Sequence, residues 1–426
     1  MRELAAGIVT ITIGGGVFLL PAVATEALGA AAWLSYALCA LVFALVVSCF
    51  AEAGSRVADT GGPYAFVGEA FGPFWGYLTG VLVLLFATTA HAAVVSGLAQ
   101  TLNALVPGIG EGGARVALLT VTLGCFTLIN ARGVRQGAVT VEIGTVAKLV
   151  PLLFLGTFGL FKVHRANLAW PGMPDAGTLT RTTMMMMFAF FGVESALGAS
   201  GEVRDPARTV PRAIFAGIGV VTVVYLAVQE AAQGILGPDI LTHRDAPLAA
   251  AAAAAFGHWA GAMLAIGAAV SMVAHTSGMM LSLPRNVFAL ARDGYLPASL
   301  ARVSPRTQAP VNAIVAYGAV VLLLSATGTF TSLLVLANAG ALLMYLLCCL
   351  AVLGLRRRNV RLEQPPFTIP GGAAVPWVAA AAIVALLSTL TGREVLAIGA
   401  ALAVAVALYA ARARRHAAAT TGGVRA

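Results

Sequence analysis

Twelve apolar runs, most of them about 20 residues long, are the feature that most constrains how this chain can fold. A helix needs about 20 apolar residues to cross the ~30 Å hydrocarbon core of a bilayer. The chain is 59% hydrophobic and only 10% charged, whereas soluble domains carry about 25% charged residues. We therefore predict an all-α integral membrane protein with spans near residues 4–28, 31–54, 74–101, 115–130, 137–161, 182–201, 211–236, 256–283, 310–326, 329–353, 376–391 and 394–411.

The basic residues indicate how these spans are oriented. Of the 26 arginines and lysines, nineteen lie at the N-terminus, in the even-numbered loops or in the tail, and six lie in the other loops. Cytoplasmic loops carry such an excess, so we expect both termini in the cytoplasm and a multi-pass protein of the cell inner membrane. Because the basic residues are scattered over short loops, the net charge of +9 is interpreted as a topology signal and not as a nucleic-acid site.

Three adjacent glycines, Gly14, Gly15 and Gly16, interrupt the first span. A break in a membrane helix frees backbone groups that protein, water or a ligand must satisfy. The amides of Gly15, Gly16 and Val17, at the positive end of the restarting helix, suit a carboxylate, and the carbonyls near Thr12 suit an ammonium. Together they predict a site for an amino acid. The alternative is that the glycines only allow close helix packing.

A second break is expected in the span at 182–201, where Gly192 precedes the carboxylate of Glu194. Broken helices at corresponding positions of two halves are typical of the substrate site of a secondary transporter. Carbonyls near Phe188 and Phe191 would add to the ammonium site. Glu194 could bind a proton, accept bonds from the broken backbone or anchor a gate, or it could be a satisfied structural carboxylate.

Several motifs carry a family resemblance. The runs GGGVFLLP at 14–21 and FFGVESA at 190–196, the latter followed by RDPARTVPR at 204–212, resemble signatures of the amino acid–polyamine–organocation (APC) superfamily. GGPY at 61–64 with FGP at 71–73, and ARDGYLP at 291–297, are similar to its loop motifs. The resemblance covers the first ten spans in order. It implies a leucine-transporter-like fold and amino acid transport.

The implied architecture is a 5+5 inverted repeat followed by two further helices. Residues 1–161 would form the first five-helix repeat and residues 182–353 the second, each beginning with a broken helix. Helices 11 and 12 would occupy residues 376–411, and residues 412–426 would form a cytoplasmic tail. We also expect a short amphipathic helix from Gly62 to Phe71.

Aromatic and sulfur-containing side chains indicate the substrate class. The motifs at the two breaks are closest to those of bacterial arginine/agmatine-type antiporters, in which a tryptophan of the eighth span stacks on the guanidinium. The best match to this position is Met279, and a tryptophan of the sixth span is matched by Phe188. With Phe191, these residues predict an apolar pocket, which argues against a guanidinium. The segment at 337–348 resembles neutral amino acid exporters. We therefore expect a small to medium neutral amino acid, with polyamine or cationic amino acid antiport as the alternative.

Three other polar side chains lie within predicted spans. His91 matches a polar position that faces the pocket in the family. It and His275 could titrate near neutral pH, or could be hydrogen-bonded core residues. Lys148 lies deep in the fifth span, in a chain that otherwise uses arginine almost everywhere. The segment around it resembles sodium-independent APC carriers, in which a lysine ammonium takes the place of sodium. Sodium-independent transport is therefore expected, unless Lys148 merely snorkels to the surface.

Other classes of membrane protein fit the sequence less well. A membrane-embedded enzyme needs clustered catalytic side chains or a phosphate-binding loop, and a channel needs ionisable rings or a carbonyl filter. Neither pattern is evident, and we expect no metal or cofactor. The expected partners are a small amino acid and the lipid bilayer. The sequence leaves open the oligomeric state, the direction of transport, and the choice between proton coupling and obligatory exchange.

Overall fold

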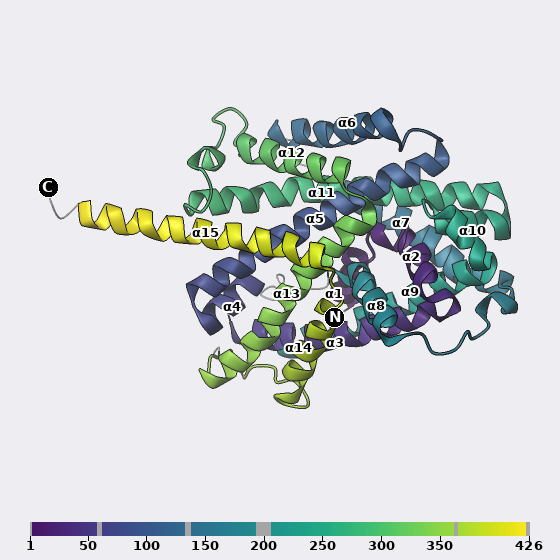
Figure 1. Ribbon diagram of the computed structural model, residues 1–426, viewed down its shortest axis with the longest axis horizontal. Coiled ribbons are helices and arrows are strands. Elements are labelled where there is room, and N and C mark those ends of the chain that lie inside the picture. Colours follow the sequence, from purple (N-terminus) through teal and green to yellow (C-terminus); the bar gives the residue numbers. More distant parts are fainter. Residues whose placement is uncertain (1, 58–61, 133–137, 193–205, 362–364, 423–426) are drawn as a thin grey trace.

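The computed structural model describes residues 2–57, 62–132, 138–192, 206–361 and 365–422, and within these ranges it has helices and no strand (Figure 1). The helices are α1 (Arg2–Thr12), α2 (Leu20–Leu28), α3 (Ala32–Arg56), α4 (Pro63–Phe71), α5 (Pro73–Leu105), α6 (Gly112–Ala131), α7 (Ala138–Phe158), α8 (Ala176–Phe190), α9 (Pro206–Leu236), α10 (Pro247–Phe256), α11 (His258–Arg292), α12 (Val311–Thr327), α13 (Phe330–Arg357), α14 (Ala374–Leu387) and α15 (Gly392–Gly422), and the short 3-10 helix η1 (Gly15–Phe18) lies between α1 and α2.

Seven helical stretches in the described part of the chain are long and apolar enough to cross a membrane, and α10, α12 and α14 are shorter apolar helices. The all-α prediction is thus confirmed for these residues, whereas the twelve-span count and the inverted repeat stay predictions. The expected short helix is present as α4. It begins at Pro63, directly after Gly62, whose φ of 56° favours glycine.

Small residues let the central helices approach closely. Helix α5 packs against α11 and α13 along much of its length. Gly340 of α13 lies so near α5 that an added Cβ would be 3.5 Å from the Phe86 backbone. At the start of α5, a Cβ on Gly76 would lie 3.0 Å from the Cα of Gly68 in α4. In lipid, where water does not drive helices together, such close packing stabilises helix association.

A buried carboxylate joins α3 to α13. Glu52 of α3 is fully buried. It accepts hydrogen bonds from Arg356 of α13 at 2.6 and 2.7 Å, from Arg56 at 2.8 and 3.0 Å, and from the backbone amide of Ile369 at 3.0 Å. Because both carboxylate oxygens have charged donors, the buried charge is compensated. We call this set of residues the Glu52 joint.

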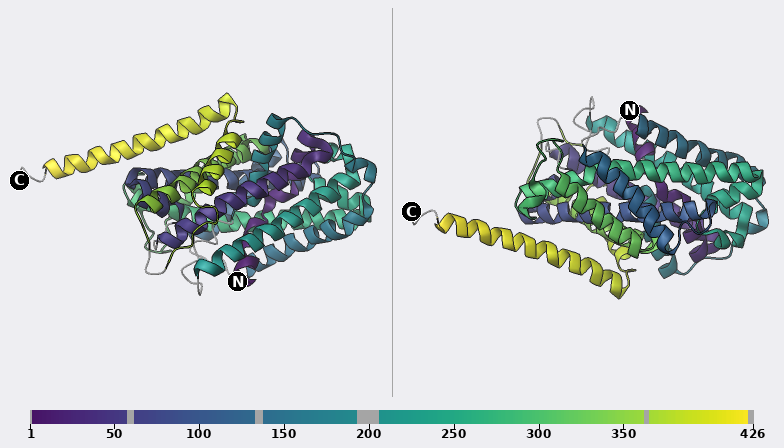
Figure 2. Two further views of the ribbon diagram at one scale, coloured as in Figure 1. Left: turned by 90° about the horizontal axis from the view of Figure 1, so that it is seen from below. Right: turned by 90° about the horizontal axis from the view of Figure 1, so that it is seen from above.

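Helix α15 stands apart from the other helices. Figure 1 and both views of Figure 2 show it extending beyond the bundle. Its first turn is held by Glu394, which pairs with both terminal nitrogens of Arg181 in α8 at 2.6 and 2.8 Å. Farther along, the guanidinium of Arg412 lies 4.3 Å from the ring centre of Tyr295. The helix is thus attached at separate points, and the site described below lies within the bundle.

Candidate functional site

The first span is broken at the three glycines. Helix α1 ends at Thr12, and Gly14 has an extended conformation with φ −92° and ψ −167°. The chain then forms η1 from Gly15, and α2 starts at Leu20. The last carbonyls of α1 and the first amides of η1 therefore face the gap, because neither has a continuing helical turn to bond with. This is the geometry in which backbone groups can bind a ligand.

Two side chains fill the space beside the glycines. An added Cβ on Gly16 would lie 2.6 Å from the ring of Phe188 in α8, and one on Gly15 would lie 2.7 Å from Met272 Cγ in α11. These contacts support the packing role that was the alternative interpretation of the glycines. A ligand that approaches the Gly15 and Gly16 amides from this side must displace Phe188 or Met272.

The second break lies directly against the first. Helix α8 ends at Phe190, Phe191 is extended, and Gly192 has a φ of 110°, which favours glycine. A Cβ on Gly192 would lie 2.8 Å from Ile11 Cγ2 and 3.2 Å from the Ile11 carbonyl oxygen. The close approach of the two backbones thus requires a glycine. Glu194 lies outside the described residues.

The hydroxyl of Tyr225 in α9 connects the ends of α1 and α8. Its oxygen lies 2.7 Å from the carbonyl oxygen of Ala189 and 3.2 Å from that of Thr12. One hydroxyl proton is therefore shared between two carbonyls that the helix breaks have freed. A buried tyrosine hydroxyl needs a partner, and here the partners are the last turns of both broken helices. Sequence analysis missed this residue, because a single tyrosine in an apolar run gives no sign of where its hydroxyl points.

Lys148 of α7 contacts the broken first span. Its ammonium donates a hydrogen bond of 2.6 Å to the carbonyl oxygen of Thr10, in the last turn of α1. The side chain is partly buried. A cation at the negative end of a helix also interacts favourably with the helix dipole. The bond links α7 to the end of α1, which is where the sequence places the ammonium, although its role in transport stays a prediction.

Aromatic side chains surround the second break. The ring centre of Phe191 lies 4.8 Å from that of Phe86 in α5, 5.9 Å from that of Phe188 and 6.1 Å from that of Tyr345 in α13. Phe188 also meets Phe330 of α13 edge to face, at 5.9 Å. These rings make the surroundings of the two breaks apolar, while their role in a substrate pocket stays a prediction.

His91 belongs to α5 and Met279 to α11. His91 is fully buried, and its Nδ1 lies 2.8 Å from the hydroxyl of Tyr317 in α12. Met279 is partly buried, two helical turns along α11 from Met272. Met272 is the residue of α11 that touches Gly15. The assignment of Met279 rested on aligned motifs, which do not show how far along α11 the first break lies. The substrate-binding roles of His91 and Met279 stay predictions.

Comparison with known proteins decides the family. A family model described as amino acid permease matches residues 2–411. The chain belongs to the amino acid permease family. This match, together with the relatives below, confirms the resemblance to the APC superfamily, and it agrees with the apolar helices in identifying a multi-pass membrane protein.

Relatives of this permease include transporters with different named substrates. An uncharacterized transporter of Mycobacterium tuberculosis is 30% identical over 91% of this chain and 86% of its own length. The branched-chain amino acid permease of Bacillus subtilis is 26% identical over 89% of this chain and 86% of its own. The serine/threonine exchanger of the same organism is 28% identical over 84% and 83%. All three are named as transporters, permeases or exchangers, which points to a non-enzymatic function.

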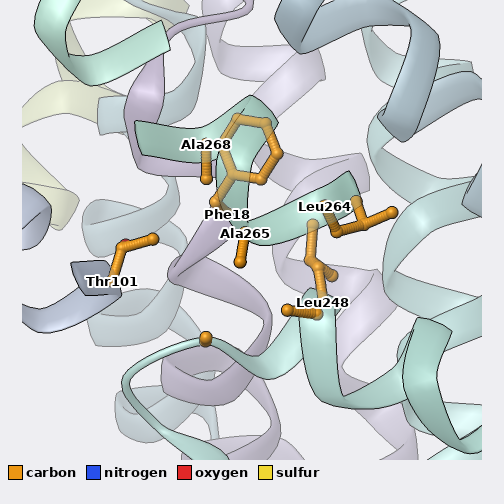
Figure 3. A pocket seen from close by; sticks show the side chains of 8 residues that line it. Phe18, Thr101, Leu248, Leu264, Ala265 and Ala268 are labelled. Carbon is orange, nitrogen blue, oxygen red and sulfur yellow. The ribbon is translucent and has the colours of Figure 1, made fainter. Parts of the chain in front are cut away.

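A cavity of the permease lies on the α2 side of the first break (Figure 3). Phe18 of η1 faces it, together with Leu248 of α10 and with Leu264 and Ala265 of α11. Thr101 of α5 also lines it, and its hydroxyl lies 3.9 Å from the sulfur of Met272. Met272 is thus in contact both with Gly15 and with a residue that lines the cavity.

Proposed function

We propose that this permease is a secondary transporter of amino acids that works by alternating access around its two helix breaks. The observation that carries this proposal is the meeting of α1 and α8, whose carbonyl ends share the Tyr225 hydroxyl while η1 restarts beside them. Free carbonyls can bind an α-ammonium, and the first amides of η1 can bind an α-carboxylate. Thr12, Gly14 to Val17 and Gly192 are the backbone part of this proposed site, and Glu194 would add a carboxylate next to it.

The proposed substrate is a neutral amino acid of small to medium size. Phe86, Phe188 and Phe191 cluster at the second break, and these apolar surroundings favour an apolar substrate side chain over a charged guanidinium. The relatives named for branched-chain amino acids and for serine and threonine support this class. A vacuolar cationic amino acid transporter of Arabidopsis thaliana, 25% identical, supports the cationic alternative. This chain covers 62% of the length of that relative.

Competition in proteoliposomes tests the substrate class. Purified permease would be reconstituted, and uptake of labelled leucine would be measured against an excess of unlabelled alanine, methionine, serine, arginine or putrescine. We expect neutral amino acids to compete and arginine and putrescine to have little effect. If arginine competes better than every neutral amino acid, the cationic alternative holds instead.

Sodium independence is proposed on the geometry of Lys148. Its ammonium lies 2.6 Å from a carbonyl oxygen in the last turn of α1, and it supplies there a positive charge that a bound cation would otherwise supply. A compact ammonium suits such a place, since it is a point charge with three donors. Equal leucine uptake in sodium and in choline buffers supports this assignment, and strict dependence on sodium contradicts it.

We further propose that residues 1–161 and 182–353 are inverted repeats, with both termini on the cytoplasmic side of the inner membrane. The excess of arginine at the N-terminus, in the even-numbered loops and in the tail supports this orientation. Reporter domains fused after Ala426, one active only in the cytoplasm and one active only outside it, test the side of the tail. Activity of the outside reporter alone would contradict the proposed topology.

A further inference from the structure

Two histidines form a pair within the bundle, with His91 fully buried and His275 partly buried. His91 of α5 and His275 of α11 each lie near the middle of a long helix, with ring centres 6.1 Å apart and planes at 65°. Nε2 is buried in both rings, and neither Nε2 has a hydrogen-bond partner among the described residues. Each ring therefore offers a nitrogen that can take up or donate a proton inside the bundle.

Two titratable groups from other helices face this pair. The Tyr317 hydroxyl oxygen of α12 lies 2.8 Å from Nδ1 of His91. The rings of Tyr317 and His91 are nearly parallel, with centres 5.8 Å apart. Lys148 of α7 is close enough to His275 for an electrostatic interaction. Both groups belong to helices that pack against α5 or α11.

The charge interactions resolved for the pair are those between the two rings and between His275 and Lys148. Helix α10 has no titratable residue. In α6, Arg115 donates to the Ser96 hydroxyl and to the carbonyl oxygens of Ser325 and Gly328. Arg356 of α13 is partly buried and is paired with Glu52. A proton on the histidine pair would thus interact mainly with Tyr317 and Lys148.

We propose that the His91–His275 pair is a proton-binding site that couples amino acid transport to a proton gradient. The proposal rests on the proposed transport function and adds its coupling ion. The pair takes one proton from water on one side of the membrane and returns it to water on the other. Two protons do not fit, because imidazolium charges at this separation repel each other strongly in a medium of low dielectric constant.

The surroundings can stabilise one such proton. A protonated His91 donates from Nδ1 to the Tyr317 oxygen. Burying a charge within a membrane span is costly. The protonated histidine pair is therefore populated only in a conformation that stabilises its charge, as a proton-coupling site requires.

Lys148 connects the proton to the first helix break. A positive charge on His275 repels the nearby ammonium, and that ammonium holds the last turn of α1 through Thr10. Protonation of the pair therefore weakens the bond between α7 and α1, and deprotonation restores it. In this way, occupancy by a proton biases the position of the broken helix that carries the amino acid site.

The test compares gradient-driven uptake with exchange in proteoliposomes that hold the full chain. Labelled leucine uptake is measured with and without an acidic exterior, and leucine counterflow is measured at equal pH on both sides. For the wild-type protein we expect severalfold stimulation by the acidic exterior and leucine-dependent acidification of the lumen, followed with a trapped pH dye. His275→Gln and His275→Asn should lose both of these responses and keep counterflow. His258→Gln, at the exposed start of the same helix, is the matched control and should behave as wild type.

The possible negative results distinguish failure of the proton site from failure of the proposed transport function. Wild-type counterflow without any response to the pH gradient refutes the proton site, and so does a gradient response that survives in both His275 variants. Loss of counterflow in both variants also refutes it, because His275 would then serve substrate binding or folding. Absence of counterflow in the wild type refutes the proposed transport of leucine itself and not the coupling site.

Discussion

The two helix breaks depend on single atoms supplied by side chains of neighbouring helices. The Tyr225 hydroxyl serves carbonyls of both α1 and α8, and the Lys148 ammonium serves a third carbonyl in α1. In a span without water, each freed carbonyl that loses its partner costs free energy. We therefore expect stability and transport to depend more on the polar atoms near the breaks than on the size of the side chains there.

Tyr225→Phe tests this at one oxygen atom. The change keeps the ring and removes the hydroxyl, which leaves two buried carbonyls without their shared donor and should cost about 1–3 kcal/mol. We expect a lower melting temperature in detergent and a severalfold slower leucine counterflow. Tyr36→Phe is the matched control, because its buried hydroxyl has no hydrogen-bond partner among the described residues and its ring lies 6.3 Å from that of Tyr225. Equal effects of the two changes would contradict the bridging role.

Gly16→Val tests the carboxylate site. The new Cβ would lie 2.6 Å from the ring of Phe188 and would cover the amides that we propose for the substrate carboxylate. We expect the variant to insert into the membrane and to lose leucine binding, measured by scintillation proximity on purified protein. Gly124→Val in α6 is the control, since a Cβ there meets nothing within 4 Å. A folded Gly16→Val protein with wild-type affinity would exclude the amide site.

Charged contacts join several pairs of helices. Lys148 joins α7 to α1, the Glu52 joint connects α3 with α13, and Arg181 connects α8 with α15. The first contact involves a helix that moves in the proposed alternating access, whereas the Glu52 carboxylate is buried and both of its oxygens are paired. These contacts should therefore affect different properties of the protein.

Lys148→Ala should slow transport more than it lowers stability. The change removes a charge-assisted bond of about 1.5–3 kcal/mol, and with it the bond between α7 and the last turn of α1. We expect leucine counterflow to fall by about tenfold or more, since 1.4 kcal/mol corresponds to tenfold. Lys162→Ala removes the other lysine of the chain, which is exposed in the segment after α7, and should transport normally. Normal transport by Lys148→Ala would contradict the proposed role of Lys148 in transport.

Glu52→Gln should lower stability. It leaves the guanidinium groups of Arg56 and Arg356 without their buried counter-charge, and breaking a buried pair costs about 3–5 kcal/mol. We expect a marked loss of thermal stability, followed by fluorescence-detected size exclusion after heating. Glu26→Gln breaks the exposed pair with Arg244, whose side chains are 49% and 57% exposed, and should cost at most about 1 kcal/mol. A similar melting temperature for both variants would show that the Glu52 joint contributes little.

At the scale of the whole molecule, the sequence predicts the helical class, the short helix α4 and the positions of both breaks. These features follow from local signals: hydropathy, glycines and a proline at a helix start. It does not predict that Tyr225 and Met272 reach the breaks. Which face of α9 or α11 meets another helix depends on how the helices cross and rotate, and uniformly apolar helices do not encode that rotation in their pattern. Lys148 was found because a lysine within an apolar span is unusual in itself.

If this permease carries neutral amino acids by alternating access without sodium, it should support leucine counterflow in sodium-free buffer. Proteoliposomes loaded with unlabelled leucine and empty proteoliposomes would be diluted into sodium-free buffer that contains a trace of labelled leucine, at equal pH inside and outside. We expect labelled leucine to accumulate transiently in the loaded vesicles, well above its level in the empty ones. Equal uptake by loaded and empty vesicles, or accumulation only when sodium is added, would contradict this expectation.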